Sequence, residues 1–497
     1  MKLGTVKKIK YMALLLCAVL LILVSCQEKT LKSPSMGGGI PPEFVVTGRF
    51  TADEHKIEVN ADKSVKDLAE MIRCKTVSSF DRSLEDDREF DKFKALLPKL
   101  FPNIYASCEY EEVTDRALLF RYKGKSELSP TVLMAHYDVV SVEAANWKKP
   151  PFDGVCEDGV LWGRGTLDTK GTLNAAMQAL EALIAEKFVP ENDIYLAFAG
   201  NEEVGGNGAP AIVDLFEKRG IVPGFVLDEG GAVVEGVFPG VKKPCALIGI
   251  AEKGMLNLEF SYEGNGGHAS SPKPHTPVGI LSAACVKVEN NPFDFRVTEA
   301  AGGMFDVLAR HSSFAYRMIF ANLWLFAPVL NMICKKNGGE MNALLRTTCA
   351  FTQMEGSKGM NVIPPSARMV ANLRLLPGDT VESAMERISK TVSNPEIQLR
   401  NIYGMNPSVV STTDCDGWNT VCKAVKSTWT DAIVAPYLMV ACSDSRHWGR
   451  VCNRVYRFSA MALSNEERAT IHGNNERVPF ETVSRAVEFY VRLIRSC

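Results

Sequence analysis

The sequence predicts an α/β fold: a layered sheet domain with a smaller α+β domain inserted into its chain. The larger domain is indicated by short apolar runs that suit strands buried on both faces, separated by a segment of helical periodicity. The insertion is indicated by a change of pattern near residue 252, where an alternating strand begins. A length of 497 residues fits this division, because it exceeds what one ordinary core serves.

The first part of the sheet domain is expected at residues 48–251. Apolar runs at residues 131–135, 194–198 and 225–227 have the length and composition of strands. Residues 173–184 repeat apolar side chains at helical spacing and predict a helix with one apolar stripe. Ligands of layered α/β sheets lie beyond the carboxyl ends of the strands, so functional residues are expected directly after each run.

The inserted domain is expected at residues 252–402. Residues 256–262 alternate apolar and polar side chains, as a half-exposed strand does, and residues 370–376 are a second strand candidate. Residues 381–392 have helical periodicity. The sheet domain is then expected to resume and to end the chain at residues 403–497.

The N-terminus has the pattern of a secretory signal peptide. Four lysines and no acidic residue in the first ten positions precede an apolar run at residues 11–24. The run ends Leu23-Val24-Ser25-Cys26, which resembles the lipobox of bacterial lipoproteins. We therefore expect a lipoprotein signal peptide at residues 1–25 and acylation of Cys26. Residues 26–47 begin rich in Ser, Gly, Pro and Lys and predict a flexible tether.

A lipid on Cys26 would place the protein at the bacterial cell envelope, in contact with the membrane through the lipid anchor only. Several acyl chains on one residue suffice for stable anchoring, because two hydrophobic signals generally do. The alternative is a plain signal peptide or a short membrane anchor, although the apolar run is shorter than the ~20 residues that a spanning helix needs.

Charge and cysteine content argue against a nucleic-acid partner, a disulfide scaffold and a cysteine-built zinc site. The chain has 56 basic and 58 acidic residues, so no basic excess favours nucleic acid as a partner. Its 14 cysteines show neither a CxxC pair nor regular spacing, which argues against a disulfide scaffold and against a cysteine-built zinc site. Individual disulfides stay open.

Acidic residues and histidines follow the predicted strands in a definite order. They are His136 and Asp138 after the first run, Asp168 in a glycine-rich turn, Glu202 and Glu203 after the second run, Asp228 and Glu229 after the third, and His472 near the C-terminus. Such donors suit zinc or a similar divalent ion, and a carboxylate near a ligating histidine can hold its other ring nitrogen. An adjacent Glu-Glu pair can divide metal binding from general-base catalysis, and one aspartate can bridge two ions ~3.5–4 Å apart.

The order HxD, GRGTLDTKG, NEEVGG, LDEGG and a late IHG closely resembles the co-catalytic zinc peptidases that include aminoacylase, carboxypeptidase S, glutamate carboxypeptidase and succinyl-diaminopimelate desuccinylase. The resemblance covers about residues 50–494. The stretches AEKG at 251–254, WLF at 324–326 and NVIPP at 361–365 are most similar to the carboxypeptidase S branch. A zinc-peptidase-type layered sheet is implied, with the inserted domain as a lid or dimerisation domain.

By this resemblance, His136 would bind one of two zinc ions, Asp168 would bridge both ions, and Asp138 would orient His136. The remaining ligand of the first ion would be Asp228 or Glu229. Their side chains point to opposite faces at a strand end, so both are not expected to bind one ion, and the sequence slightly favours Asp228.

The resemblance also implies that Glu203 and His472 complete the shell of the second zinc ion, while Glu202 is the general base. The expected function is a zinc-dependent amidohydrolase or carboxypeptidase that cuts a peptide or N-acyl amino acid beside a free carboxylate. The alternative is a catalytically inactive, substrate-binding lipoprotein of the same fold. Retention of the Glu-Glu pair and of Asp168 favours the enzyme, and no GxSxG motif supports a serine nucleophile.

Four further residues are candidates for substrate contacts, three of them by the same resemblance and Arg374 because it alternates with apolar neighbours on a predicted strand. His268, in GGHAS, would polarise the scissile carbonyl, often from a partner subunit, and Asn361 would meet the substrate. Arg446, in SDSR, would bind the terminal carboxylate with its guanidinium fork, with Arg374 as a helper. The alternatives are a surface-loop histidine for His268 and a solvent-facing strand charge for Arg374.

The segment between residues 290 and 345 lengthens the inserted domain. Because some similar proteins dimerise through this domain and others are single chains with an enlarged one, both a homodimer and a monomer stay open. Residues 320–333 within it are predominantly apolar and are predicted most simply as a packed helix. A wall for a lipophilic acyl group or a membrane-facing patch is the alternative.

Overall fold

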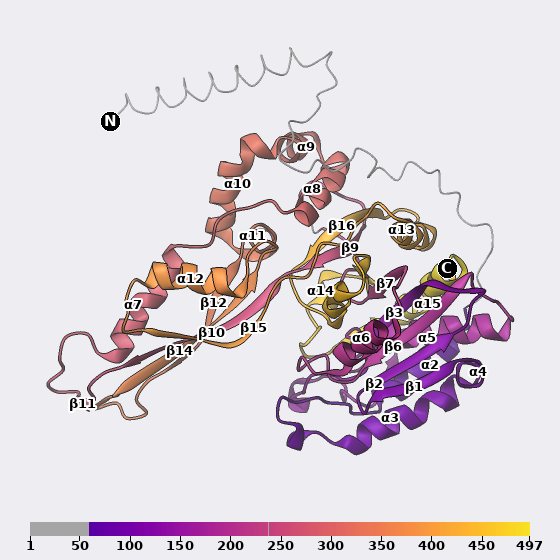
Figure 1. The fold of residues 1–497 in the computed structure, drawn as a ribbon, viewed down its shortest axis with the longest axis horizontal. Helices are drawn as coiled ribbons and strands as arrows, with labels where there is room; N and C mark the ends of the chain where they lie inside the picture. Colours follow the sequence, from indigo (N-terminus) through magenta and orange to yellow (C-terminus); the bar gives the residue numbers. More distant parts are fainter. Residues whose placement is uncertain (1–58, 237) are drawn as a thin grey trace, which may run out of the picture. The chain divides into compact units, whose positions relative to one another are not determined.

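The computed structural model describes residues 59–236 and 238–497 (Figure 1). The predicted signal peptide, the tether and the candidate lipidation site Cys26 lie outside these residues and stay predictions. Every cysteine in the described ranges carries a free thiol, so none of them is paired in a disulfide.

A ten-stranded mixed sheet forms the central layer of the larger domain. Its strands are β1 (Glu109–Thr114), β2 (Ala117–Tyr122), β3 (Ser126–His136), β6 (Asn192–Ala199), β7 (Phe225–Asp228), β8 (Val233–Val234), β9 (Cys245–Glu252), β16 (Ile433–Met439), β17 (Val455–Arg457) and β18 (Ala462–Leu463). Their order is β1-β2-β6-β3-β7-β17-β9-β8-β18, with β16 beside β9. The apolar runs at residues 131–135, 194–198 and 225–227 are confirmed as parts of the parallel strands β3, β6 and β7.

Helices cover both faces of this sheet and complete the predicted α/β layers. One face carries α2 (Ala61–Ile72), α3 (Asp87–Leu100), α4 (Pro102–Ser107), α5 (Lys170–Ala185), α13 (Asp416–Thr428) and α15 (Phe480–Arg495); the other carries α6 (Gly208–Arg219) and the 3₁₀ helix η4 (Asp444–Arg450). Alternate side chains of β3 explain the two layers, because Leu133 and Ala135 join one core while Val132 and Met134 join the other.

The helix predicted at residues 173–184 is α5, and it is more deeply buried than a single apolar stripe implies. Every residue from 170 to 181 is buried. The reason is that α2 and α15 pack on the side of α5 that the sheet leaves free. A stripe pattern alone cannot reveal such a second layer of helices.

A four-stranded antiparallel sheet forms the smaller domain. Its strands are β10 (Gly254–Glu263), β12 (Thr348–Glu355), β14 (Ser366–Leu375) and β15 (Gln398–Met405), in the order β12-β14-β10-β15. The helices α7 (Pro277–Asn290) and α12 (Val381–Val392) share a separate core with it. The strand and helix predictions at residues 256–262, 370–376 and 381–392 are confirmed, although Leu376 lies just outside β14. The expected domain boundary at residue 403 falls inside β15.

The remaining elements are short or lie between β10 and β12 in the chain. They are η2 (Arg82–Leu84), η3 (Ala144–Asn146), β4 (Val155–Glu157), β5 (Val160–Trp162), β11 (Gly267–His268), α8 (Glu299–His311), α9 (Phe314–Ala321), α10 (Leu323–Asn337), α11 (Gly339–Leu345), β13 (Val362–Ile363), α14 (Asn465–Arg468) and β19 (Arg477–Pro479). The segment expected as one inserted domain, residues 252–402, does not share a single core. Helix α8 within it packs against β16, and the buried side chains of α8 belong to the core of the large sheet.

The prediction of one packed helix at residues 320–333 is wrong. The stretch is the end of α9 and most of α10, two helices bent by 104° relative to each other. Phe320 and Leu330 are buried, but Trp324, Leu325 and Met332 are exposed. No single helix in the described part of the chain is long and apolar enough to cross a membrane.

Candidate metal centre

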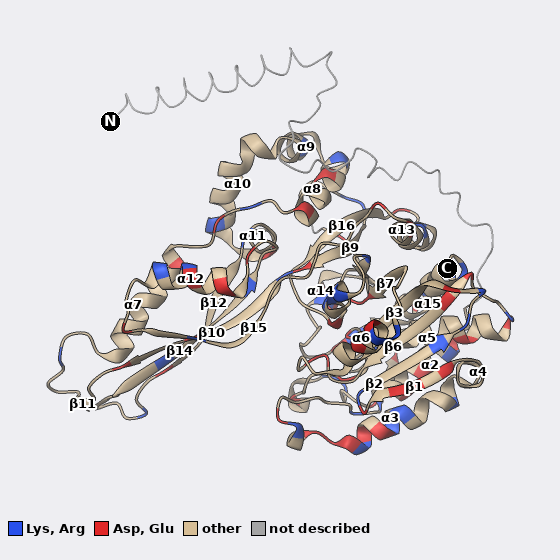
Figure 2. Ribbon diagram, viewed as in Figure 1, with Lys and Arg blue, Asp and Glu red and all other residues tan. Residues whose placement is uncertain are grey.

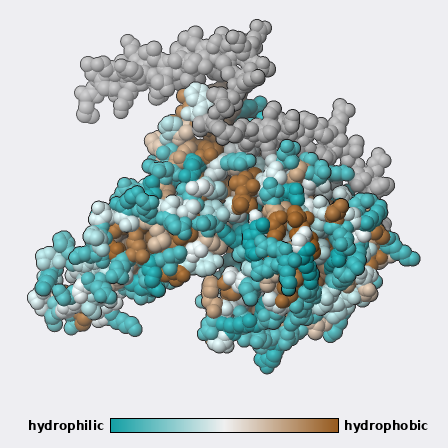
Figure 3. Space-filling view, viewed as in Figure 1, coloured by the Kyte–Doolittle hydropathy of each residue, from teal (hydrophilic) through white to brown (hydrophobic). Residues whose placement is uncertain are grey.

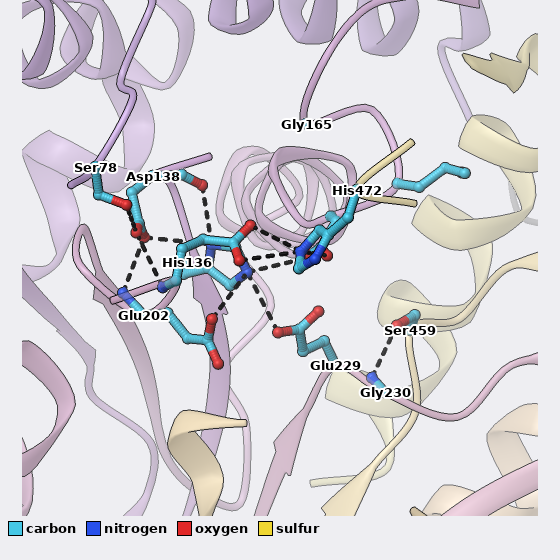
Figure 4. A network of polar contacts seen from close by, with 12 residues as sticks. Ser78, His136, Asp138, Gly165, Glu202, Glu229, Gly230, Ser459 and His472 are labelled. Atoms are coloured by element: carbon cyan, nitrogen blue, oxygen red, sulfur yellow. Dashed lines mark hydrogen bonds and ion pairs between the residues drawn. The ribbon is translucent and has the colours of Figure 1, made fainter. Parts of the chain in front are cut away.

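Three parallel strands bring the predicted ligands together at their carboxyl ends. His136 is the last residue of β3, Glu202 and Glu203 follow β6, and Asp228 and Glu229 lie at the end of β7. Because β3, β6 and β7 are parallel, their carboxyl ends lie at the same edge of the sheet, and these side chains meet at that edge. Figure 4 shows several of them close together. The convergence expected from the sequence is therefore present.

Asp138 holds both His136 and the Glu-Glu turn. His136 Nδ1 lies 3.0 Å from the Asp138 backbone oxygen and 3.3 Å from its carboxylate Oδ1. The Asp138 carboxylate also accepts the backbone N–H groups of Glu202 and Glu203, each at 3.1 Å, and the Ser78 hydroxyl at 2.7 Å. Asp138 is fully buried, so these bonds act in a low-dielectric setting and fix the turn firmly.

Asp168 lies between the two histidines. Its Oδ1 is 2.9 Å from His136 Nε2, and its Oδ2 is 3.0 Å from His472 Nε2. Glu203 Oε2 approaches the same nitrogen of His472 at 3.0 Å. One carboxylate thus faces both histidines, which is the position that a ligand bridging two ions must occupy.

Two overlapping sets of ligand atoms among the described residues are close enough to hold a metal ion. One set is His136, Asp168 and Glu203, and the other is His136, Glu202 and Glu229. Within each set the atoms lie within 4.8 Å of one another. Glu202 Oε2 is 3.9 Å from His136 Nε2, whereas Glu229 Oε1 is closer, at 3.3 Å.

Asp228 and Glu229 point to different surroundings, as neighbouring residues at a strand end should. Glu229 faces His136, whereas Asp228 Oδ2 accepts the backbone N–H of Ser445 at 3.0 Å and belongs to neither of the two sets. The geometry therefore favours Glu229 as the ligand, in contrast to the slight preference for Asp228 from the sequence.

Burial and the neighbouring carboxylates act in opposite directions on the pKa values of His136 and His472. Burial alone would lower the pKa of His136, but the carboxylates of Glu229, Asp138 and Asp168 raise it well above the ordinary value. Hydrogen bonds to Asp168 and Glu203 raise the pKa of His472 to about 10, against the effect of burial. The carboxylates thus provide a strongly cation-stabilising environment.

The carboxylates of the site lie close together and largely away from solvent, and their pKa values are shifted as a result. Burial raises the pKa of Glu202 well above its ordinary value and raises that of Glu229 to about 8, helped by the neighbouring carboxylates. The pKa of Asp168 is lowered despite its burial, because His136 and His472 both bond to it. A buried carboxylate group without positive partners is unfavourable, so cations are needed here.

The donor set fits divalent metal ions. Within the described residues, Asp168, Glu202, Glu203 and Glu229 form ion pairs with the two histidines and with no lysine or arginine. Imidazole nitrogens and carboxylate oxygens are ligands that zinc accepts, and the mixture of the two suits it. Two divalent ions would balance four carboxylates.

Glu476 is a functional residue that the sequence analysis missed. This fully buried carboxylate accepts the backbone N–H groups of Gly165, Leu167 and Asp168 at 2.7–3.2 Å and pairs with Arg164 at 2.6 Å. It therefore fixes the loop that carries Asp168 to the segment that carries His472. No pattern of spacing reveals it, because its partners are distant in sequence and mostly backbone groups.

A second buried network, also unforeseen, lies beside the metal ligands. Glu252 at the end of β9 accepts hydrogen bonds from Ser443, Ser445 and Arg457 at 2.5–3.0 Å. It thereby holds the start of η4, whose Asp444 is buried and has one oxygen, Oδ2, without a hydrogen-bond partner among the described residues. Burial and the nearby acidic groups raise the pKa of Asp444 well above its ordinary value.

Arg446 and Arg374 converge on Cys442. Arg374 Nη1 lies 3.5 Å from Cys442 Sγ. Arg446 donates from Nη2 to the backbone oxygen of Asn406, while its Nη1 is 3.8 Å from Glu252 Oε2 and lacks a hydrogen-bond partner among the described residues. A largely buried guanidinium is compatible with binding a substrate carboxylate, which stays a prediction for Arg446.

His268 and Asn361 lie together but away from these arginines. His268 is in β11, which pairs with β13, and Asn361 directly precedes β13. Both lie beyond the Glu263 end of the β10–β14 ladder, whereas Arg374 lies at its other end, opposite Met255. At about 3.4 Å per residue the two ends are roughly 30 Å apart. One chain therefore does not bring Asn361 into the predicted carboxylate clamp.

Comparisons with known proteins found a matching family and several relatives. The model of a family described as peptidase family M20/M25/M40 matches residues 132–496. The probable carboxypeptidase S-like 2 of Dictyostelium discoideum is 34% identical over 471 residues, which are 90% of each chain. The N-fatty-acyl-amino acid synthase/hydrolase PM20D1 of Xenopus tropicalis is 34% identical over 458 residues, or 90% of this chain and 89% of that one.

The fold also has solved counterparts. An M20 family metallo-carboxypeptidase, Sso-CP2 from Sulfolobus solfataricus, matches with a TM-score of 0.64 over 87% of this chain and 98% of its own. The identity is 17%, so this likeness concerns the fold alone. The predicted fold class is confirmed by it.

Proposed function

Because this chain belongs to peptidase family M20/M25/M40, we propose that it hydrolyses a peptide or N-acyl amino acid amide bond beside a free carboxylate, with two zinc ions in its candidate metal centre. The supporting observation is Asp168, whose two oxygens face His136 and His472. A bridging carboxylate belongs to two-metal hydrolytic sites. A substrate-binding lipoprotein without catalysis would have no use for Glu202, a carboxylate buried beside this bridge.

Different residues of the site would bind the metal ions, transfer the proton and hold the substrate. The zinc ligands would be His136, Asp168, Glu203, Glu229 and His472. Bound zinc supplies Lewis acidity, which polarises the scissile carbonyl and lowers the pKa of water. Glu202 accepts the proton of the attacking water and delivers it to the leaving nitrogen. Arg446 binds the free carboxylate and so places the amide bond against Glu202.

The metal content tests this proposal directly. We expect about two zinc ions per chain, and loss of thermal stability when a chelator removes them, because ligands that bind only the folded state stabilise it. Glu229→Gln should lose about one ion, whereas Asp228→Asn, its matched partner, should keep both. Elemental analysis and melting curves measure these effects. A wild-type chain without zinc and without activity toward N-acyl amino acids would support the binding lipoprotein instead.

The position of His268 supports a homodimer. Since His268 lies at the far end of the small sheet from Arg374, we propose that a second copy supplies it to the active site. Glu202→Ala and His268→Ala should each be nearly inactive, and a mixture should recover about a quarter of wild-type activity after statistical subunit exchange. Absence of recovery from a mixture that light scattering shows to be dimeric would contradict the shared site.

Attachment to the envelope is proposed through the lipid on Cys26. We expect Cys26→Ala to move the chain out of the membrane fraction, because acyl chains and not the apolar run at residues 11–24 would hold it there. Fractionation with immunodetection measures this. Retention of the variant with its signal peptide uncleaved would point to an ordinary membrane anchor.

A further inference from the structure

The helices α9 and α10 expose several large apolar side chains. We call this set the α9–α10 apolar surface, and its residues have exposed fractions from 41% to 69%. They are Phe314, Tyr316, Trp324, Leu325, Val329, Met332 and Ile333. Part of this surface appears as brown and tan atoms in Figure 3, over the place of α10 in Figure 1. Water is an unfavourable neighbour for so many apolar groups in one place.

The surface is held rigidly from beneath, so its exposure is built into the fold. Phe320 of α9 packs its ring against Phe238 and Phe305, with centroids 4.5 and 5.5 Å apart. Asn331 of α10 accepts a hydrogen bond of 2.6 Å from the buried Arg346. Because α10 is apolar on its buried side and on its outer side alike, it does not follow the pattern of a surface helix in water.

The bend between α9 and α10 determines whether these helices could span a membrane or only lie along its surface. Together the two helices have the length and hydropathy of a membrane span, but they turn by 104° at Asn322. A chain with this bend does not form one straight span. Two short apolar helices with aromatic side chains are instead suited to lie in the plane of a membrane interface.

The charged side chains within the segment that carries this surface are all basic. Residues 307–339 contain no Asp or Glu, and Arg317, Lys335 and Lys336 have no ion-pair partner among the described residues. Figure 2 shows α10 as tan with blue at one end. Nearby, burial lowers the pKa of His311, and so do the positive charges of Lys243, Lys426, Arg317 and Arg310. An apolar surface with a basic rim complements a layer of anionic headgroups.

We propose that the α9–α10 apolar surface docks onto an anionic phospholipid bilayer, with its apolar side chains at the boundary between headgroups and acyl chains and its basic side chains against the phosphates. A second copy is less suited, because a symmetric contact would oppose Arg317, Lys335 and Lys336 to their own kind. A single acyl chain of a substrate would leave these charges without a role. Membrane contact then extends beyond the lipid expected on Cys26.

Quenching of Trp324 by lipid tests the docking in the full chain. The protein is reconstituted in vesicles of phosphatidylglycerol and phosphatidylcholine with or without brominated acyl chains. Subtracting the emission of Trp324→Phe isolates Trp324, because the other tryptophans are buried or half-buried in the described structure. We expect brominated lipid to quench Trp324 by roughly twofold. The quenching should weaken in about 1 M salt and in Lys335→Gln/Lys336→Gln.

A matched pair of variants separates this surface from apolar exposure in general. Leu325→Glu should abolish the quenching, whereas Leu128→Glu, at a site 77% exposed on β3, should leave it unchanged. Equal emission with brominated and ordinary lipid overturns the proposal. It is also overturned if Leu325→Glu only dissociates a dimer, or only raises KM for substrates with long acyl chains, while Trp324 is never quenched.

Discussion

Replacing Glu202 with alanine is expected to lower kcat by about 10²- to 10⁴-fold while the zinc content stays near that of the wild type, because general-base contributions are of this size. The side chain is 16% exposed and lies 3.9 Å from His136 Nε2, farther than the Glu229 carboxylate. The hydrogen bond from the Glu202 backbone N–H to the Asp138 carboxylate does not involve the replaced side chain, so the turn should persist. Steady-state kinetics and elemental analysis on the same samples measure both quantities.

The neighbouring glutamate provides the control for this experiment. Glu203 approaches His472 from the same turn, so Glu203→Ala should lose zinc as well as activity. Glu202→Gln keeps the shape of the side chain and removes its basicity, and it should be as inactive as the alanine variant. If Glu202→Ala loses zinc in the same proportion as Glu203→Ala, Glu202 is a ligand and the assignment as general base fails. A rate within twofold of wild type would also contradict it.

The layered fold and most of the centre could be predicted because strand ends in a parallel sheet are local features. An apolar run of strand length identifies β3, and the residues after it, His136 and Asp138, then have a predictable place. Glu476 could not be predicted in this way. Its partners are backbone N–H groups near Asp168, about three hundred residues earlier in the chain, and no side-chain pattern records such bonds.

Two other features depend on packing that the sequence does not express. Apolar periodicity finds α10 but does not distinguish a helix covered by protein from one left open, so residues 320–333 were predicted as packed and are largely exposed. At the end of β7, Asp228 and Glu229 have equal chemistry. Their surroundings separate them in the structure, because the Ser445 N–H binds Asp228 whereas Glu229 lies 3.3 Å from His136.

Arg446 has the properties that a residue needs in order to bind the terminal carboxylate of a substrate. Its side chain is 10% exposed, and Glu252 and Asn406 fix it from behind. Its Nη1 is buried and has no hydrogen-bond partner among the described residues. A charge-assisted bond in such a partly desolvated place contributes on the order of 1.5–3 kcal/mol. Lysine keeps the charge but cannot form the planar pair of bonds.

Arg446→Lys is therefore expected to lower kcat/KM for free-acid substrates by roughly 10- to 100-fold, at about 1.4 kcal/mol per decade. Substrates with an amidated carboxylate should change little, because the lost bond is never made to them. Arg450→Lys, in the same 3₁₀ helix but half-exposed and paired with Asp214 and Glu217, is the matched control and should behave as wild type. Kinetics with N-acyl amino acids and dipeptides in acid and amide forms, at fixed zinc, measure the preference. If the amides fall as far as the acids, Arg446 maintains the fold of η4 and does not bind the carboxylate.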